Sequence, residues 1–220
     1  KEVEEMLACM RHRGPDDSGV VELGGYVLGM ARLKILDLVS GNLCPVVSGG
    51  LALAFNGECY NYLELKHELE ELGEIFDTTG DSEVLLKAYK RWGKDCLDRF
   101  NFMGAFAISD GKTIFIARDI AGEKPRYYTP SPFRFASEAK ALDFDCEEFP
   151  PAHCGTYDIQ TREFRIERWW TPPTDTFVGS LEEAVARLDT LLADAIKLRT
   201  RADVPYGLYF SGGIDSTLIS

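Results

Sequence analysis

Several features are missing from this sequence, and each absence excludes a class of protein. The six cysteines are scattered without any C-x-x-C pair, which argues against a zinc module and against a thioredoxin-like redox site. No stretch approaches the roughly 20 apolar residues of a membrane span, and the start of the chain lacks the apolar core of a signal peptide. We therefore expect a cytoplasmic protein, outside the membrane, whose thiols are reduced and mostly buried.

Positive charge is also scarce, because 24 basic residues stand against 36 acidic ones and give a formal net charge of -12. Phosphate affinity comes mainly from clustered Lys and Arg, so this balance argues against nucleic acid and against an anionic membrane surface. A hydrophobic content of 45% over 220 residues is enough for a real core. Small molecules or other proteins are the expected partners.

Short apolar runs separated by Gly, Asp and Asn clusters give the first 170 residues the pattern of strands and turns. Asp110-Gly111 suits a turn that needs positive φ, and Gln160-Thr161 interrupts a second pair of apolar runs. Two hairpins are therefore predicted, which pair 105–108 with 113–117 and 155–159 with 163–166. Further strands are expected at 26–30, 51–55 and 102–109.

Helices are expected between these strands. Leucines recur at helical spacing over 65–72, and apolar positions over 82–92 are followed by Gly93 as a C-cap. The first six residues have the acidic pattern of an amphipathic helix. Strands with interpolated helices predict an α+β fold of sheets packed with helices, and not a regular βαβ alternation.

The composition changes near residue 170, where Pro172-Pro173 and polar residues predict a linker. We expect a first domain at 1–170, a linker at 171–180 and the truncated start of a second domain at 181–220. Ser180 begins a capping-box pattern, which predicts a helix with one apolar face.

A strand is expected at 204–210, and Ser-Gly-Gly-Ile-Asp-Ser follows it at 211–216. The start of a helix favours oxyanions, and glycines let the main chain approach them closely. Taken alone, this pattern is also an ordinary turn between a strand and a helix. The longer run 206–216 resembles the pyrophosphate loop of the ATP pyrophosphatases. That resemblance implies ATP and Mg²⁺ as cofactors, held by Phe210, Ser211, Gly212, Gly213, Asp215 and Ser216.

Three polar clusters in the first 140 residues have ordinary explanations when each is taken alone. The charged run 11–17 is then a solvated loop, Asn56-Gly57-Glu58 a hairpin turn, and Gly80-Asp81-Ser82-Glu83 a helix cap. Their order resembles that of class II glutamine amidotransferases. Ala-Arg-Leu-x-Ile at 31–35 belongs to the same resemblance. Within that class, Gly-Glu-Lys-Pro at 122–125 and Ala-Ser-Glu-Ala-Lys-Ala-Leu at 136–142 resemble asparagine synthetase.

This resemblance covers nearly the whole chain and implies both a fold and an activity. The fold is an N-terminal-nucleophile-hydrolase αββα sandwich, followed by the beginning of an α/β ATP-pyrophosphatase domain. The activity is that of an ATP-dependent amide ligase, in which glutamine hydrolysis supplies ammonia to an aspartyl-adenylate made from aspartate and ATP. A homodimer is also implied. Two alternatives stay open: a β-lactam-synthetase-like ligase with a silent amidotransferase domain, and a non-catalytic module that kept the fold.

Glutamine hydrolysis requires groups that hold the α-carboxylate and the α-amine, a nucleophile, and donors for the oxyanion. By resemblance, Arg32 binds the carboxylate through its guanidinium fork. Asp81 pairs with the ammonium, and the Asn56 side chain and Gly57 N–H form the oxyanion hole. The glutamine-binding set implied in this way is Arg32, Ile35, Leu36, Asn56, Gly57, Glu58 and Asp81.

The nucleophile of this family is an N-terminal cysteine whose own α-amine acts as the base. Because the chain opens at Lys1, the resemblance places a Cys-Gly-Ile segment with a strand ahead of that residue. None of the internal cysteines carries a free amine, and Cys9 and Cys44 are expected to be packing residues. Arg126 departs from the family's pattern, because it stands where a leucine is common.

Overall fold

The computed structural model describes residues 1–41 and 43–220. Contacts divide the chain into two compact units, Lys1–Thr171 and Pro172–Ser220. Among the described residues, no helix is long and apolar enough to cross a membrane.

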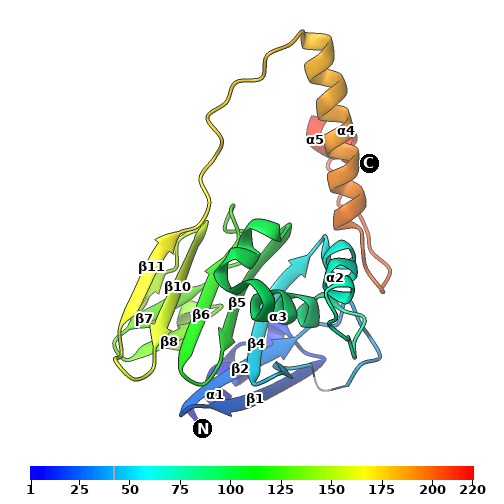
Figure 1. Cartoon of the computed structure of the whole chain (residues 1–220). Coiled ribbons are helices and arrows are strands. Elements are labelled where there is room, and N and C mark those ends of the chain that lie inside the picture. Colours follow the sequence, from blue (N-terminus) through cyan, green and yellow to red (C-terminus); the bar gives the residue numbers. More distant parts are fainter. Residues whose placement is uncertain (42) are drawn as a thin grey trace. The chain divides into compact units, whose positions relative to one another are not determined.

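A six-stranded antiparallel sheet forms the centre of the first unit (Figure 1). Alternation along its central strand β5 determines what each face packs against. Phe102, Phe106 and Ile108 point to one core cluster, whereas Ala107 faces another on the opposite side. The strands lie in the order β11 (Phe164–Arg168), β10 (His153–Asp158), β6 (Thr113–Arg118), β5 (Phe102–Ser109), β4 (Leu51–Cys59) and β3 (Val46–Ser48).

Helices α2 (Tyr62–Glu71) and α3 (Asp81–Trp92) cover the face with the large side chains. Leu65 and Leu69 of α2 are buried there at the predicted helical spacing. Gly93 ends α3 with a φ of 58°, as the sequence predicts. The core on this side therefore forms between the sheet and two amphipathic helices.

Two smaller sheets cover the opposite face. The first pairs β1 (Asp17–Leu23) with β2 (Tyr26–Arg32), and the second has the order β8 (Phe133–Ala136), β7 (Tyr127–Pro130) and β9 (Glu147–Glu148).

Helix α1 (Glu2–Cys9) packs on the outside of these smaller sheets. A Cβ atom added at Gly29 of β2 would lie 2.5 Å from the Val3 side chain of α1, so the helix approaches the strand closely. The layers are therefore two helices, the six-stranded sheet, the two smaller sheets and α1. This is the αββα order that the resemblance predicts.

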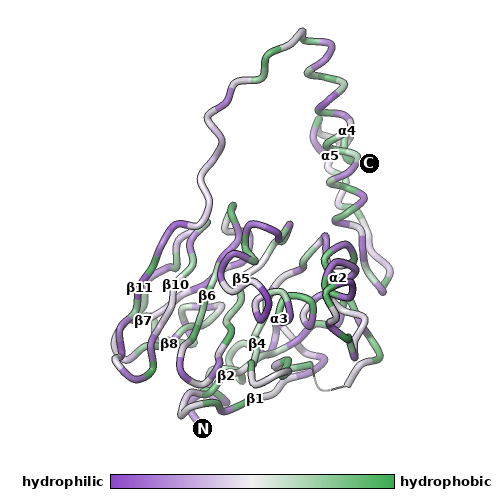
Figure 2. The backbone as a smooth tube through the Cα atoms, viewed as in Figure 1, coloured by the Kyte–Doolittle hydropathy of each residue, from purple (hydrophilic) through white to green (hydrophobic). Residues whose placement is uncertain are grey.

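The remaining elements are short 3₁₀ helices and the two helices of the second unit. Ser180 and Glu183 form both bonds of the predicted capping box at the start of α4. Hydrophilic and hydrophobic residues alternate along the turns of α4 (Figure 2). The bounds are Arg11–Arg13 for η1, Gly93–Arg99 for η2, Ala139–Leu142 for η3, Leu181–Arg199 for α4 and Ile214–Ile219 for α5.

Both predicted hairpins are confirmed, because β5 pairs with β6 and β10 pairs with β11 in antiparallel register. The predicted strand at 204–210 is wrong, since this segment carries no strand assignment. Its apolar composition is that of a strand, but strand structure depends on a ladder with a neighbour, and the described part of the second unit contains none. Asn56-Gly57-Glu58 is also no hairpin turn, because these residues continue β4 and lie opposite β5.

Candidate functional site

A pocket of about 380 Å³ lies where β2, β4 and the start of α3 meet. It is lined by every residue that the sequence assigns to glutamine binding, although these residues come from three separate segments. Arg13 and Lys124 add positive charge to its wall. The predicted residues along it are Arg32, Ile35, Leu36, Asn56, Gly57, Glu58 and Asp81.

Arg32 is the last residue of β2, and its guanidinium is held by main-chain carbonyls. Nη2 donates to the carbonyls of Leu36 at 2.8 Å and Asp37 at 2.9 Å. Nη1 is buried and has no hydrogen-bond partner among the described residues. The side chain is therefore fixed in position with one donor left for a ligand. The Leu36 carbonyl, at the edge of the pocket, thus holds the Arg32 guanidinium in place.

Asp37 supports this arrangement, and sequence reasoning missed it. Its side chain is 1% exposed and its φ is 54°. The carboxylate accepts hydrogen bonds from Ser40 N at 3.0 Å and Thr79 N at 3.2 Å. Burial acts to raise the pKa of Asp37, but the hydrogen bonds from Ser40, Thr79 and Gly80 outweigh it and lower that pKa. Asp37 therefore ties the Arg32 loop to the loop that precedes α3.

Asp81 is the first residue of α3 and is 6% exposed. Its carboxylate accepts hydrogen bonds from Cys59 N at 2.9 Å and from the Ser82 hydroxyl at 3.2 Å. Gly80 occupies the N-cap position without any side-chain cap, so the cluster 80–83 does more than cap the helix. Burial raises the pKa of Asp81 to about 6, and the charge of Glu58 acts in the same direction. A cation placed beside Asp81 would relieve that penalty.

Asn56 and Gly57 lie in β4, opposite Ala105 and Gly104 of β5. The Asn56 Nδ2 atom is buried without a hydrogen-bond partner among the described residues. A Cβ atom at Gly57 would lie 2.0 Å from the Met103 carbonyl oxygen, and φ there is 153°. Only glycine fits this position, and the side-chain amide of Asn56 next to it lines the pocket.

Glu138 joins two of the sequence motifs that lie far apart in the chain. Its carboxylate contacts His12 at 2.9 Å, Arg13 at 3.1 Å and Lys140 at 2.8 Å. These contacts, led by Lys140, lower the pKa of Glu138 to about 2. The Arg-His-Arg run is thereby anchored next to the pocket by the Ala-Ser-Glu run.

The internal cysteines do not supply a nucleophile to this pocket, because none is among its described lining residues. Burial raises the pKa of Cys44 to about 12 and that of Cys154 to about 11. Cys59 and Cys96 are raised further above the ordinary thiol range by the same cause. Such thiols stay protonated, and the thiolate is the reactive form.

Cys9 is exposed, so its predicted packing role is wrong. It lies on the solvent side of the last turn of α1, where its thiol donates to the Met6 carbonyl at 3.1 Å. Cys44 is half-buried.

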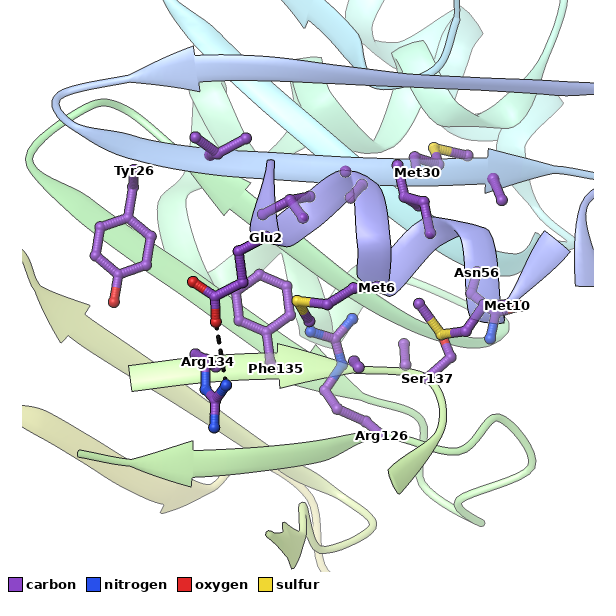
Figure 3. Close-up of a pocket in the computed structure, with 18 of the residues that line it drawn as sticks. Glu2, Met6, Met10, Tyr26, Met30, Asn56, Arg126, Arg134, Phe135 and Ser137 are labelled. Atoms are coloured by element: carbon purple, nitrogen blue, oxygen red, sulfur yellow. Dashed lines mark hydrogen bonds and ion pairs between the residues drawn. The ribbon is translucent and has the colours of Figure 1, made fainter. Parts of the chain in front are cut away.

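A second cavity, of about 420 Å³, lies beneath α1 between β2 and β8 (Figure 3). In the described structure, β2 is paired only with β1, and β8 is paired only with β7. Each strand therefore has one edge without a partner strand. Tyr26, the first residue of β2, donates its hydroxyl to the carbonyl of Phe133, the first residue of β8, at 2.6 Å. Asn56 lines both cavities, so they meet at the predicted oxyanion hole.

The second unit brings the predicted phosphate-binding residues together at the start of α5. The hydroxyls of Ser211 and Ser216 lie 3.0 Å apart, and the Ser216 hydroxyl donates to the Gly213 carbonyl at 3.1 Å. Gly212 has a φ of 76°, which favours glycine. Small residues and paired hydroxyls fit a phosphate group. Among the described residues, no group of three or more His, Cys, Asp or Glu side chains is arranged to hold a metal ion.

Two solved structures resemble the first unit in fold. One is described as the allosteric regulatory enzyme of purine biosynthesis, with a TM-score of 0.63 and 24% identity over 78% of this chain and 46% of that chain. The other is glutamine phosphoribosylpyrophosphate amidotransferase from B. subtilis complexed with ADP and GMP. Its TM-score is 0.60 with 22% identity, over 78% of this chain and 47% of that chain. These likenesses confirm the predicted N-terminal-nucleophile-hydrolase fold.

Sequence relatives share both units. The chain is 32% identical over 256 residues to the glutamine-hydrolyzing asparagine synthetase 3 of Bacillus subtilis, covering 99% of this chain and 41% of that protein. It is 35% identical over 227 residues to the glutamine-hydrolyzing asparagine synthetase 2 of Oryza sativa subsp. japonica, covering 98% of this chain and 37% of that protein. The chain thus spans less than half the length of these relatives.

Family models agree with this division of the chain. Residues 187–220 match the model described as asparagine synthase. Residues 1–165, well over half of the sequence, match the model of the glutamine amidotransferase domain. The chain therefore belongs to the glutamine amidotransferase domain family.

Proposed function

We propose that this chain is the glutaminase part, and the start of the synthetase part, of a glutamine-hydrolysing asparagine synthetase. One observation carries the proposal: a single pocket combines an unpartnered guanidinium donor, a buried carboxylate and an unpartnered amide donor, from Arg32, Asp81 and Asn56. These groups complement the α-carboxylate, the α-ammonium and the side-chain amide of free glutamine. Relatives named as glutamine-hydrolyzing asparagine synthetases support the same activity.

Each group has a defined task in this proposal. Arg32 Nη1 donates to the glutamine α-carboxylate, while Nη2 stays bound to the main chain. Asp81 accepts the α-ammonium, which offsets the burial of its carboxylate. Asn56 Nδ2 and the Gly57 N–H stabilise the oxyanion that forms when the amide carbon is attacked. Glu58, or main-chain carbonyls near Ile35 and Leu36, help Asp81 to hold the ammonium.

The nucleophile is a cysteine at the start of a strand that lies between β2 and β8. The two unpaired strand edges on either side of the cavity support this placement, because a strand seated there pairs with both. Helix α1 begins beside Tyr26 and Arg134, where Glu2 contacts Arg134 at 3.1 Å (Figure 3). Met10, the residue that follows the helix, lies near Asn56.

The direction of α1 supports the position of that cysteine. A strand that turns back into the start of α1 runs in the opposite direction through the cavity. Its first residue therefore lies at the Asn56 end, beside the oxyanion donors. The protonated state of the buried internal thiols also favours a nucleophile from outside the described set.

In the second unit, the phosphates of ATP are held by Ser211, Gly212, Gly213 and Ser216. Phe210 lies against the nucleotide. Mg²⁺ accompanies the phosphates, with Asp215 as the carboxylate of the loop. When bound, ATP would transfer its AMP group to the aspartate carboxylate with release of pyrophosphate, and ammonia would then displace AMP to give asparagine. The proposal includes a cytoplasmic homodimer that binds glutamine, aspartate and ATP.

The test uses the complete polypeptide as its gene encodes it. Glutamate release from glutamine, and pyrophosphate release from ATP that depends on aspartate, are both expected. A complete polypeptide that releases no glutamate contradicts the glutaminase assignment. Pyrophosphate release that does not depend on aspartate contradicts the assignment of aspartate as the acceptor. A β-lactam-synthetase-like ligase would give this result, because it releases pyrophosphate with its own substrate. Mass spectrometry of the mature N-terminus, which should be cysteine, separates these two cases independently.

A further inference from the structure

The segment 72–80, which joins α2 to α3, is held by the helix that follows it. Glu83 is buried at the third position of α3, where a capping glutamate accepts from the N-cap residue. Here the carboxylate reaches further back along the chain, and accepts from Thr78 N at 2.9 Å and Asp77 N at 3.1 Å. The Thr78 hydroxyl donates to the same oxygen at 2.8 Å. These bonds fix the path of the chain that leads into Asp81.

Lys87, one turn further along α3, completes this clamp. Its side chain is 7% exposed, and Nζ lies 2.6 Å from Glu83 Oε1. The same ammonium donates to the Ile75 carbonyl and lies 4.4 Å from the centre of the Phe76 ring. Burial acts to raise the pKa of Glu83, but the hydrogen bonds that it accepts, led by the one from Lys87, outweigh burial and lower that pKa. The carboxylate is therefore ionised at neutral pH.

The clamped segment reaches both of the groups that are suited to the two charged ends of an amino acid. Thr79 N donates to the Asp37 carboxylate at 3.2 Å, and the Asp37 carbonyl accepts from Arg32 Nη2 at 2.9 Å. A Cβ atom added at Gly80 would lie 3.0 Å from the Asp37 Cβ atom, so the two loops are in direct contact. Asp81 follows Gly80 directly. The segment thereby links the position of the Asp81 carboxylate to that of the Arg32 guanidinium.

We propose that Glu83 and Lys87 are positioning residues for the glutamine site. Through the segment 75–80 they hold Asp81 and Arg32 at the separation that binds the α-ammonium and the α-carboxylate of the substrate. This inference rests on the proposed function, which assigns those two groups to glutamine. Neither Glu83 nor Lys87 is among the described lining residues of the pocket, so both act through the segment and not on the substrate.

The proposal separates substrate affinity from the rate of the chemical step. The oxyanion donors of Asn56 and Gly57 belong to β4, outside the clamped segment. Loosening the clamp should therefore raise KM for glutamine, while kcat should change little.

The test compares methionine variants of the pair in the complete polypeptide. Glu83→Met and Lys87→Met each leave one buried charge alone, so each is expected to lower Tm by roughly 10 °C. The double variant has no unpaired charge, and its Tm is expected to recover. KM for glutamine should instead rise roughly tenfold in Glu83→Met and stay raised in the double variant, because the donors of Asp77 and Thr78 have lost their acceptor.

Two further variants serve as controls. Glu83→Gln keeps a side-chain oxygen that can accept from the same main-chain donors, so it should raise KM less than Glu83→Met does. Lys90→Met is the matched control on the same helix. Lys90 contacts Glu74 of the same segment at 3.2 Å, but its side chain is 49% exposed, and its loss should leave both Tm and KM unchanged.

The double variant decides between a positioning role and a merely structural one. If KM returns to the unsubstituted value together with Tm, the pair is only structural and the proposal is wrong. A fall in kcat without a rise in KM would also contradict it. Where a single variant does not fold, the double variant and Glu83→Gln still give both values.

Calorimetric titration with glutamine measures binding without hydrolysis and separates this proposal from the proposed function. Weaker binding by the double variant, in a polypeptide that releases no glutamate, supports the positioning role and contradicts the glutaminase assignment. Glutamate release with an unchanged KM in the double variant contradicts only the positioning role. An unsubstituted polypeptide that does not bind glutamine contradicts both.

Discussion

Replacing Asp81 by asparagine is expected to make the protein more stable while weakening its hold on glutamine. The carboxylate is 6% exposed, and burial raises its pKa from 3.8 to about 6. Each pKa unit corresponds to about 1.4 kcal/mol, so ionised Asp81 lowers the free energy of unfolding by on the order of 3 kcal/mol at pH 7. An asparagine oxygen can still accept from Cys59 N, and the Ser82 hydroxyl can turn to accept from the new amide. We expect Asp81→Asn to raise the free energy of unfolding by roughly 2 kcal/mol at pH 7.

The pH dependence gives this prediction its sign. Between about pH 4 and pH 6 the folded protein keeps a proton on Asp81 that the unfolded chain has already lost. The Asp81 contribution to the free energy of unfolding therefore falls as pH rises through this window, and stays low above it. In the Asp81→Asn variant, the free energy of unfolding no longer loses this contribution as pH rises. The gain in stability should consequently be seen at pH 7.5 and be much smaller at pH 4.

Glutamine binding should respond in the opposite direction. Loss of a charged hydrogen bond to the α-ammonium costs about 1.5 to 3 kcal/mol, which raises KM for glutamine by roughly 10- to 100-fold. Urea denaturation at both pH values and initial rates of glutamate release measure the two effects on the complete polypeptide. A lower free energy of unfolding for Asp81→Asn at pH 7.5, or an unchanged KM, would refute the reasoning.

Asp37→Asn is the matched control, because Asp37 is also a buried aspartate but its pKa is lowered. Ionised Asp37 stabilises the fold above its unfolded pKa, and that contribution is lost as pH falls. The same substitution should therefore destabilise here, by about 1 to 3 kcal/mol at pH 7.5. Opposite signs at two buried aspartates exclude a general effect of removing negative charge from an acidic protein.

Three further substitutions test the other groups of the pocket. Arg32→Lys should raise KM for glutamine at least about tenfold, because an ammonium lacks the planar donor set that serves two carbonyls and a carboxylate; initial rates over a glutamine series measure it. Asn56→Ala should lower kcat by about 10²- to 10³-fold with little change in Tm, since Nδ2 has no hydrogen-bond partner within the described structure; a clearly lowered Tm would contradict this. Gly57→Ala should lower the free energy of unfolding by roughly 3 kcal/mol in thermal denaturation, because the new Cβ meets the Met103 carbonyl at 2.0 Å.

Local patterns predicted the helices and hairpins well, because their causes lie within a few residues. The Ser180 and Glu183 capping box and the β5–β6 hairpin depend on bonds between near neighbours. Asn56-Gly57 shows where such patterns fail. The same dipeptide suits a hairpin turn and also a strand whose main chain lies close to its neighbour. Only the pairing with β5 shows that it is part of a strand. The strand predicted at 204–210 is wrong for a related reason: an apolar composition does not provide the neighbouring strand that a ladder needs.

The site was predicted as a set of residues but not as a geometry. The resemblance supplied Arg32, Asn56 and Asp81 from separate motifs, and the structure brings them around one pocket. Asp37 was missed because its role depends on a contact with Thr79, 42 residues further along the chain. Glu138 was quoted as part of a motif, but its contact with Arg13 spans 125 residues and has no local signal. Positioning residues of this kind are found from folded contacts.

The hydrogen bonds that Asp37 and Asp81 receive indicate that the first carboxylate is structural and the second suits a ligand. Asp37 receives enough donors from the loops around it to offset its desolvation, so its charge is complete within the fold. Asp81 receives two hydrogen bonds, from Cys59 and Ser82, and its charge stays unfavourable. A buried carboxylate that destabilises the protein, next to donors of Arg32 and Asn56 that lack partners among the described residues, fits the proposed kind of ligand, which is cationic at one end and anionic at the other. A free amino acid has that charge distribution, and the lone amide donor of Asn56 selects one that carries a further carbonyl group.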